Sequence, residues 1–427
     1  MSIQLKEITS RGDLKKFVRF PYRHYRNNRY WIPPLISGEM KTLDRKKNPA
    51  FDHCDVKFLL AYRNGKPAGR IAGIINHRYV EQWKRKDARF CWFDTVDDRE
   101  VSAQLLGAIE QWARSRGMER LIGPMGFTTF ERQGILVKGF EEMPTFSGVY
   151  NYPYYPEHLE AHGYAKEIDY VEYEVKVPAE IPEKAKKIRD LIMERYHLRS
   201  LRANSTKEML PYADSVFRVI NEAYEPLYGF TRLTEKQIDY FVKRYFSFIK
   251  PDYVTAVLDE NERVLGFQIS VPSLSRALQK AGGRIFPTGW YHIQKALKNP
   301  DRIDILLVGV LPEYQSKGIN SIFMTDLTRI AIDRGIRYAE SNSELEENVK
   351  VRCKNQFDNE LGTGQGVIST IYGMHILFAG KNVVIAGFGH CSSGMAIRSR
   401  GLGANVTVTE ACPFGTDIKG AGKFIKS

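Results

Sequence analysis

The stretch Val310-Leu311-Pro312-Glu313-Tyr314-Gln315-Ser316-Lys317-Gly318-Ile319-Asn320 decides how this chain of 427 residues is interpreted. It follows the apolar run 303–308, which predicts a strand, and it leads into a segment with helical spacing of apolar residues up to Ile330. The first N–H groups of a helix have no partner within the helix, so they can bind an anion. Gly318 permits close approach of the backbone, and Lys317 adds positive charge. The stretch predicts a phosphate-binding loop, with an ordinary strand-to-helix turn as the alternative.

The same order of elements occurs twice along the chain. In the first half, the turn Asn64-Gly65 predicts a hairpin, which a third strand and a helix follow. The second half repeats this order and ends its helix at Arg334-Gly335, as the first half does at Arg116-Gly117. The expected strands and helices are 58–62, 69–75, 90–93 and 101–112 in the first half, then 253–257, 264–269, 303–308 and 319–330. This pattern predicts an internal duplication of one α/β unit, with a boundary near residue 180.

The loop resembles the acyl-CoA pyrophosphate loop of the GNAT superfamily of N-acyltransferases, Arg/Gln-x-x-Gly-x-Gly/Ala. Gln315 and Gly318 match it, and Asn320 replaces the final small residue. Residues 1 to about 350 resemble a bacterial family with two GNAT-like domains in tandem, through the motifs Trp31-Ile32-Pro33-Pro34, Asn48-Pro49, Gly69-Arg70-Ile71-Ala72, Gly123-Pro124-Met125 and Tyr150-Asn151-Tyr152-Pro153-Tyr154-Tyr155-Pro156. The resemblance implies an acyl-CoA site formed by Val308, Val310, Gln315, Ser316, Lys317, Gly318, Ile319 and Asn320. It also implies acyl transfer, expected to be acetyl transfer from acetyl-CoA, to an unidentified amine or peptide.

The first half has a different loop at the matching place. Its sequence is Val96-Asp97-Asp98-Arg99-Glu100, with three acids and no glycine. Carboxylates would repel the phosphates of CoA. We therefore expect the first half to be a degenerate GNAT-like domain that is structural or shapes the acceptor site.

The resemblance implies that the acceptor amine attacks the thioester while a backbone N–H of the third strand polarises its carbonyl. Asp304, Glu222 and Tyr228 are the candidate acid and base residues, and a structural hydrogen-bonding role is the alternative for each. The segment 341–350, expected to be helical, has no tyrosine where many family members carry the general acid. A non-catalytic CoA-binding protein is therefore a second hypothesis.

The C-terminal part has another composition, because residues 362–427 contain 13 of the 34 glycines. An apolar run ending at Ala386 precedes Gly387-Phe388-Gly389, and Glu410 follows a second apolar run. This order resembles the start of the NAD domain of S-adenosylhomocysteine hydrolase over about residues 351–412, and implies NAD contacts at Gly387, Gly389 and Glu410. The rest of that enzyme has no counterpart, so an inactive hydrolase-like protein is the alternative and the truncation disfavours NAD binding. The junction indicates a fusion or a rearrangement of two genes.

Composition sets limits on the remaining possibilities. Lys and Arg exceed Asp and Glu by 13, which favours an anionic partner, but the basic stretch 19–26 lacks a nucleic-acid motif and is expected to be a solvated face. The five cysteines are dispersed, and the N-terminus lacks a secretory pattern, so we expect no metal site, no membrane partner and a cytoplasmic location. The expected fold is α/β, with a degenerate GNAT-like domain over 1–180, an acyl-CoA-binding one over 181–350 and a partial Rossmann-like βαβ segment over 351–427.

Overall fold

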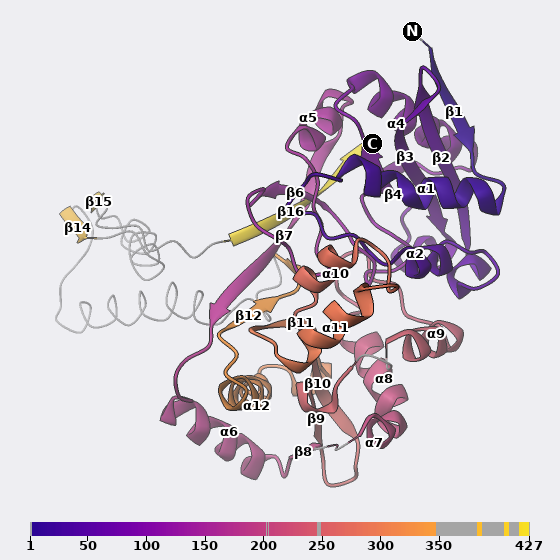
Figure 1. The fold of residues 1–427 in the computed structure, drawn as a ribbon. Coiled ribbons are helices and arrows are strands. Elements are labelled where there is room, and N and C mark those ends of the chain that lie inside the picture. Colours follow the sequence, from indigo (N-terminus) through magenta and orange to yellow (C-terminus); the bar gives the residue numbers. More distant parts are fainter. Residues whose placement is uncertain are drawn as a thin grey trace. The chain divides into compact units, whose positions relative to one another are not determined.

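Figure 1 shows the fold in a computed structural model. The structure describes residues 2–201, 203, 205–245 and 249–346, and the strands within 382–386, 405–409 and 418–426. The chain divides into a large unit, residues 1–343 with 418–427, and a smaller unit, residues 344–417. Both halves of the expected duplication lie in the large unit.

The first half contains the predicted hairpin, third strand and helix. Asn64 and Gly65 have φ values of 51° and 73°, which suit the tight turn between β2 and β3. The elements are β1 (Ile3–Glu7), α1 (Arg11–His24), α2 (Ile36–Thr42), η1 (Pro49–Asp52), β2 (Cys54–Arg63), β3 (Lys66–Asn76), α3 (His77–Trp83), β4 (Asp87–Thr95), α4 (Arg99–Ser115), β5 (Arg120–Gly123), β6 (Ile135–Lys138), α5 (Tyr154–Ala161) and β7 (Ala165–Lys176).

The second half repeats the hairpin, third strand and helix after an additional helical segment. Its elements are α6 (Glu183–Arg195), β8 (Arg199–Leu201), α7 (Thr206–Met209), η2 (Leu210–Tyr212), α8 (Ala213–Ala223), α9 (Glu235–Tyr245), η3 (Pro251–Tyr253), β9 (Val254–Leu258), β10 (Val264–Pro272), α10 (Ser275–Ala281), α11 (Gly289–Lys298), β11 (Arg302–Val310), η4 (Pro312–Tyr314), α12 (Asn320–Asp333) and β12 (Tyr338–Ser341). The short strand β13 (Glu344–Leu345) follows. A helix was expected over 341–350, but residues 341–346 form strands and a turn, and 347–350 lie outside the described residues.

The strand pairing confirms the mixed α/β fold class and repeats between the halves. In each half an antiparallel hairpin pairs with a third strand, and a helix then leads to a fourth strand parallel to the third. The parallel pairs are β4 with β5 and β11 with β12. One sheet runs β1-β2-β3-β4-β5-β16-β7-β12-β11-β10-β9-β8, with β16 (Ile418–Lys426) near its middle. β7 pairs with β16 on one side and β12 on the other, so it links the two halves.

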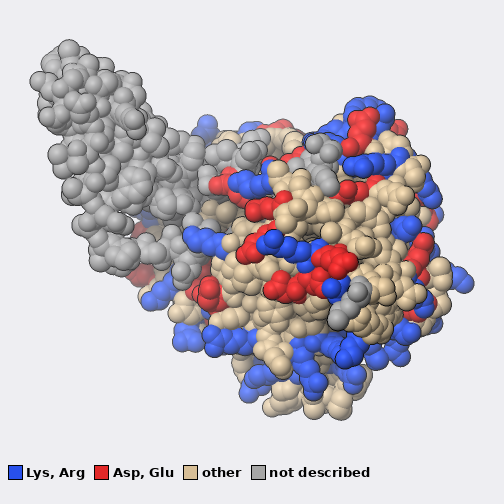
Figure 2. Space-filling view, turned by 90° about the horizontal axis from the view of Figure 1, so that it is seen from above, with Lys and Arg blue, Asp and Glu red and all other residues tan. Residues whose placement is uncertain are grey.

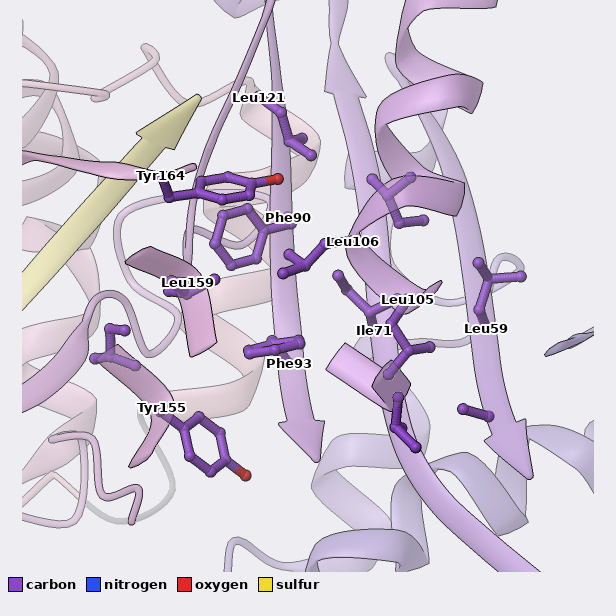
Figure 3. Packing of buried hydrophobic residues seen from close by; sticks show 14 of the residues in the cluster. Leu59, Ile71, Phe90, Phe93, Leu105, Leu106, Leu121, Tyr155, Leu159 and Tyr164 are labelled. Carbon is purple, nitrogen blue, oxygen red and sulfur yellow. The ribbon is translucent and has the colours of Figure 1, made fainter. Parts of the chain in front are cut away.

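The core of the first half lies between the sheet and the helices α4 and α5. Figure 3 shows Phe90 and Phe93 of β4 beside Leu105 and Leu106 of α4. The aromatic rings of Phe90 and Phe93 meet edge to face at 6.0 Å between centroids. Each such fully buried side chain stabilises the fold by about 1.5–3 kcal/mol. The helix face predicted from spacing, with Val101, Leu105 and Ile109, is the buried face: Val101, Leu105 and Ile109 are all 0% exposed.

Polar contacts fasten the first half to the second. The guanidinium of Arg89 is buried and donates to the carbonyl of Gly229 at 3.0 Å. The indole N–H of Trp83 donates to the carbonyl of Phe230 at 2.7 Å. These donors come from β4 and α3, so the two halves are held together by buried hydrogen bonds as well as by the shared sheet.

In the smaller unit, β14 (Asn382–Ala386) and β15 (Asn405–Thr409) pair in parallel. This pairing is the one expected for the first two strands of a Rossmann-like segment. β16 differs from the expected 351–427 segment, because it pairs with β5, β6 and β7 in the sheet of the large unit. No strand was predicted from the sequence of β16, which is rich in glycine and lysine.

Candidate functional site

The loop between β11 and α12 has two residues with positive φ. Ser316 and Gly318 have φ values of 63° and 84°, and the helix begins at Asn320. Ile319, the residue before the helix, makes no side-chain hydrogen bond to the helix N-terminus. The N-terminus of α12 therefore has no side-chain cap. The N–H groups of Ser321 and Ile322 donate to the carbonyls of Gly318 and Ile319 at 2.8 and 2.9 Å, so an anion would bind at the N–H groups that precede them.

Side chains brace this loop from within. The Gln315 amide donates to the carbonyl of Val310 at 3.1 Å, and the Lys317 ammonium lies 4.6 Å from the centre of the Tyr314 ring. A Cβ on Gly318 would lie only 2.3 Å from Cδ1 of Ile192 in α6. Gly318 is thus required both by its backbone conformation and by its packing against α6.

The third strand of the second half has a bulge where it separates from its neighbour. β11 pairs with β12 only from Arg302 to Ile305. The pairing with β10 then shifts, because Ile305 lies opposite Ser270 and Leu307 opposite Ile269, so Leu306 is an extra residue. Residues 305–308 are half-buried. β-bulges of this kind often lie next to binding sites, where they redirect backbone groups.

Two hydrogen bonds mark the edges of the separated strands. The Asn342 side chain donates to the carbonyl of Leu306 at 3.3 Å, just after β12 ends. The Tyr224 hydroxyl donates to the carbonyl of Val308 at 2.9 Å. Val308 and Val310, predicted to contact the cofactor, thus lie on the strand segment beyond the bulge and directly before the loop.

Asp304 lies in a cluster of charged side chains on three adjacent strands, in which Asp304 and Glu340 are buried and Glu174 is exposed. The register places Asp304 of β11 beside Glu340 of β12, and Glu340 beside Glu174 of β7. The Arg302 guanidinium donates to both Glu174 and Glu340. Neither Asp304 oxygen has a partner in hydrogen-bond geometry among the described residues, although the Ser273 side chain faces it.

The electrostatics of Asp304 follow from this position. It is fully buried, and burial together with the charge of Glu340 raises the pKa of Asp304 to about 8. Such a carboxyl group is largely protonated at neutral pH and can accept a proton once it ionises. Among the described residues, no group of three or more His, Cys, Asp or Glu side chains is arranged to hold a metal ion.

A cavity of about 180 Å³ lies beside this cluster. Strand residues Glu174, Arg302 and Glu340 form one wall, the helices α10 and α11 form another, and the first half contributes 142–144. Four carboxylates and two guanidinium groups line it, so its charge favours a cation. The lining side chains that bear charge are Glu142, Glu174, Asp301, Glu340, Arg276 and Arg302.

The three candidate acid and base residues lie on different elements: Asp304 on β11, Glu222 on α8, and Tyr228 in the loop between α8 and α9. The Tyr228 hydroxyl donates to Glu167 of β7 at 2.6 Å, and burial followed by this bond raises the pKa of Tyr228 far above its usual value. Glu222 lies half-buried on α8.

Sequence reasoning missed the partners of Asp304. Glu172, Glu174 and Glu340 lie on strands whose neighbours are distant in the chain, and the pairing of β7 with β12 crosses the boundary between the halves. Glu172 and Glu174 lie two residues apart on β7 and so share a face of the sheet, but this spacing alone is weak evidence of a site. Only the register reveals that this face meets Asp304.

The predicted NAD contacts lie outside the described residues. Gly387 and Gly389 follow β14 in the sequence, and Glu410 follows β15. The parallel pairing of these two strands fits the resemblance, whereas the roles of the three residues stay predictions.

Charged side chains of both signs share the surface. On the face in Figure 2, Lys and Arg lie among Asp and Glu, which are densest near its middle. In the basic stretch 19–26, Arg19, Arg23 and Arg26 are exposed while Phe20 and Tyr25 are buried, as a solvated helix face requires. None of the described helices has the length and apolar character needed to cross a bilayer.

Two copies of a hairpin, a bulged third strand, a helix and a parallel fourth strand place the large unit in the mixed α/β class with an internal repeat. No family model matches the chain. It is 26% identical over 321 residues to Protein YghO of Escherichia coli, covering 74% of this chain and 81% of that protein. It is 28% identical over 323 residues to the bacterial ceramide synthase of Caulobacter vibrioides, covering 72% and 80%.

The C-terminal part has different relatives. A segment of 61 residues is 54% identical to the adenosylhomocysteinase of Nostoc, and covers 14% of either chain.

Among solved structures, a tandem GNAT protein from the clavulanic acid biosynthesis pathway aligns with a TM-score of 0.46 and 13% identity, over 83% of this chain and 93% of that one. The chain is thus similar to two sets of proteins, one along its body and one in its tail.

Proposed function

We propose that this protein is an acyl-CoA-dependent N-acyltransferase whose second half, within residues 181–350, binds the acyl-CoA. The observation that carries the proposal is the uncapped N-terminus of α12, which follows a bulged strand that separates from its parallel neighbour. A pyrophosphate binds at the helix N-terminus, with Gln315, Ser316, Lys317, Gly318, Ile319 and Asn320 around it. The backbone beyond the bulge, at Val308 and Val310, then lies along the pantetheine arm and the thioester.

The acidic cavity supports an amine as the acceptor. Successive strand residues advance about 3.3 Å, so Asp304 lies roughly 7 Å along β11 from the bulge at Leu306. Asp304 does not itself line the cavity, but its strand neighbour Glu340 does, so an ammonium group bound beside Glu340 gives one proton to the ionised carboxylate of Asp304. Its nitrogen then attacks the thioester carbon, the carbon–sulfur bond breaks, and the thiolate of CoA takes the second proton. Glu222 and Tyr228 are the alternative acid and base.

The relatives indicate which amines to test first. A ceramide is an amide of a long-chain amino alcohol and a fatty acid, so the name of the Caulobacter relative describes an N-acylation. We propose a long-chain primary amine as the acceptor class and a fatty acyl-CoA, alongside acetyl-CoA, as donor. The first half, residues 1–180, contributes the acceptor wall through Glu142 and Glu174.

Two measurements test this function. Calorimetric titration of the full-length chain with acetyl-CoA and with palmitoyl-CoA should show saturable binding of at least one. Release of the CoA thiol should then depend on a primary amine, with sphinganine and short alkylamines as acceptors and their N,N-dimethyl forms as controls. Absence of binding would refute the acyl-CoA site, and binding without turnover of any amine would favour the non-catalytic alternative. Titration with NAD tests Gly387, Gly389 and Glu410 separately.

A further inference from the structure

A helical hairpin next to the cavity exposes an unusual group of large apolar side chains. The segment joining α10 to α11, with the start of α11, contains Ile285, Phe286, Trp290 and Tyr291, which are 38%, 75%, 49% and 55% exposed. These four lie within seven consecutive residues. Contiguous exposed apolar side chains on a folded protein mark an interaction surface.

The hairpin is firmly attached, so this exposure is not that of a loose loop. The N–H of Ile36 donates to the carbonyl of Gly283 at 2.9 Å, and the Gln279 amide donates to the carbonyl of Arg29 at 2.7 Å. Leu274 and Leu278 of the hairpin pack with Ile32 of the first half in a buried cluster. One side of α10 and α11 is thus fixed to the body (Figure 1), while the aromatic tip faces solvent.

The charge around the tip has one sign. Residues 275–298 contain five Lys and Arg and no Asp or Glu. Arg276 pairs with Asp301 at 3.4 Å, whereas the other four make no ion pair with a described residue. Those four, all exposed, are Lys280, Arg284, Lys295 and Lys298.

We propose that this hairpin docks the protein on an anionic lipid surface, with Phe286, Trp290 and Tyr291 inserted among the headgroups and the four free cations above lipid phosphates. Aromatic residues with a polar edge favour the interface of a bilayer, and each nearby cation strengthens attraction to anionic lipid. Such an arrangement is typical of a protein that lies on a membrane surface, and it requires no spanning helix. The surface stands independently of the proposed acyl transfer. Because α10 and α11 also line the cavity, docking would bring a lipid-borne amine to its rim.

Flotation of the full-length chain with vesicles tests the proposal. Vesicles of phosphatidylglycerol mixed with phosphatidylcholine should carry the protein, and phosphatidylcholine alone should carry much less. Phe286→Ser with Trp290→Ser should weaken binding by about tenfold or more. The matched control, Leu191→Ser with Leu210→Ser, removes side chains that are 60% and 51% exposed elsewhere and should bind like wild type.

Charge variants separate electrostatic attraction from insertion. Lys280→Gln with Lys295→Gln should weaken binding about fivefold per cation at low salt, whereas Lys15→Gln with Lys41→Gln should not. Brominated lipid should quench the tryptophan emission of wild type more than that of Trp290→Phe. Equal flotation of wild type and the aromatic variant would overturn the proposal. So would a dimer, seen by analytical ultracentrifugation, that the aromatic variant abolishes while vesicles bind neither form. Thiol release with a soluble short-chain amine should be unchanged in every hairpin variant, which distinguishes loss of docking from failure of the proposed enzyme.

Discussion

Both halves of the large unit have a bulge in the third strand, but the residues around the two bulges differ. In the first half, Ala72 pairs with Cys91 and Arg70 with Asp94, so β4 also has one extra residue, and Trp92 adopts a φ of 45°. The indole of Trp92 donates to Glu39 at 3.0 Å. In both halves a backbone N–H after the fourth strand donates back to a carbonyl of the third strand, from Met125 to Phe90 at 2.8 Å and from Asn342 to Ile305 at 3.0 Å.

The helices that follow the third strands, α4 and α12, also differ between the two halves. Asp98 caps α4, because its carboxylate accepts from the N–H groups of Glu100 and Val101 at 3.1 and 3.3 Å. Ile319 offers no such group to α12. The two copies of the duplicated unit thus differ in whether a side chain caps the helix that follows the third strand.

The largest expected effect concerns the third strands. In β11 the last residue that pairs with β10 before the bulge is Ile305, and Asp304 directly precedes it. The matching position in β4 is held by the core residue Phe90. Asp304→Asn should lower the acyl-transfer rate roughly 10²–10⁴-fold, because it removes the proton acceptor, with little change in the Kd of acyl-CoA. Asp333→Asn, at the exposed end of α12, is the control. The wild-type rate should rise with pH through about 8, and an unchanged profile in the variant would exclude Asp304 as the base.

The raised pKa of Asp304 also predicts how stability depends on pH. The fold favours the protonated form, so this stabilisation is complete below the ordinary value of 3.8 and is lost as the pH rises through about 8. Asp304→Asn removes the titration. The Tm of wild type should therefore fall more between pH 6 and pH 9 than that of the variant, as scanning calorimetry would show.

The second effect concerns the phosphate loop. Gly318→Glu should weaken acyl-CoA binding about a hundredfold, because it combines a strained positive φ, a clash with Ile192 and a negative charge at the helix N-terminus. Gly335→Glu is the matched control, since Gly335 has a φ of 67° and a Cβ added there would meet nothing within 4 Å. If Gly318→Glu kept its affinity for acyl-CoA, as the control does, the CoA would bind elsewhere.

Much of this comparison could be predicted from local sequence, since Asn64-Gly65, the helix spacing and the absence of acids around Gly318 are local signals. The bulges could not, because they arise from pairing between strands and leave no pattern along one strand. Asp304 was a candidate from its place on β11. Its position beside Glu340, and that of Glu340 beside Glu174, depend on the pairing of β11, β12 and β7, which no pattern along β11 shows. The helical segment after Ser205 divides into α7, η2 and α8 at Pro211, which cannot donate a backbone hydrogen bond within a helix.

A smaller effect tests the charge at the second helix. Asn320→Asp adds a carboxylate to the first turn of α12, where the first half already has one. It should stabilise the helix by about 0.3–1 kcal/mol while weakening acyl-CoA binding about fivefold, because the helix N-terminus attracts either anion. Asn320→Ala separates the loss of the amide from the gain of charge. Tighter binding in Asn320→Asp would contradict an anion site at this helix.

The smallest effect tests whether the first helix is purely structural. Asp98→Ala removes the cap of α4 and should lower the free energy of unfolding by about 1 kcal/mol, measured in urea, with no change in acyl-CoA affinity. Asp98→Asn keeps a good capping group but loses the ion pair with Arg63 at 3.0 Å, so it should cost less. If uncapping α4 instead created a second acyl-CoA site by titration, the first half would retain a latent copy of the ligand loop. The acids at Asp97 and Glu100 argue against that result, since they remain beside the helix N-terminus when Asp98 is gone.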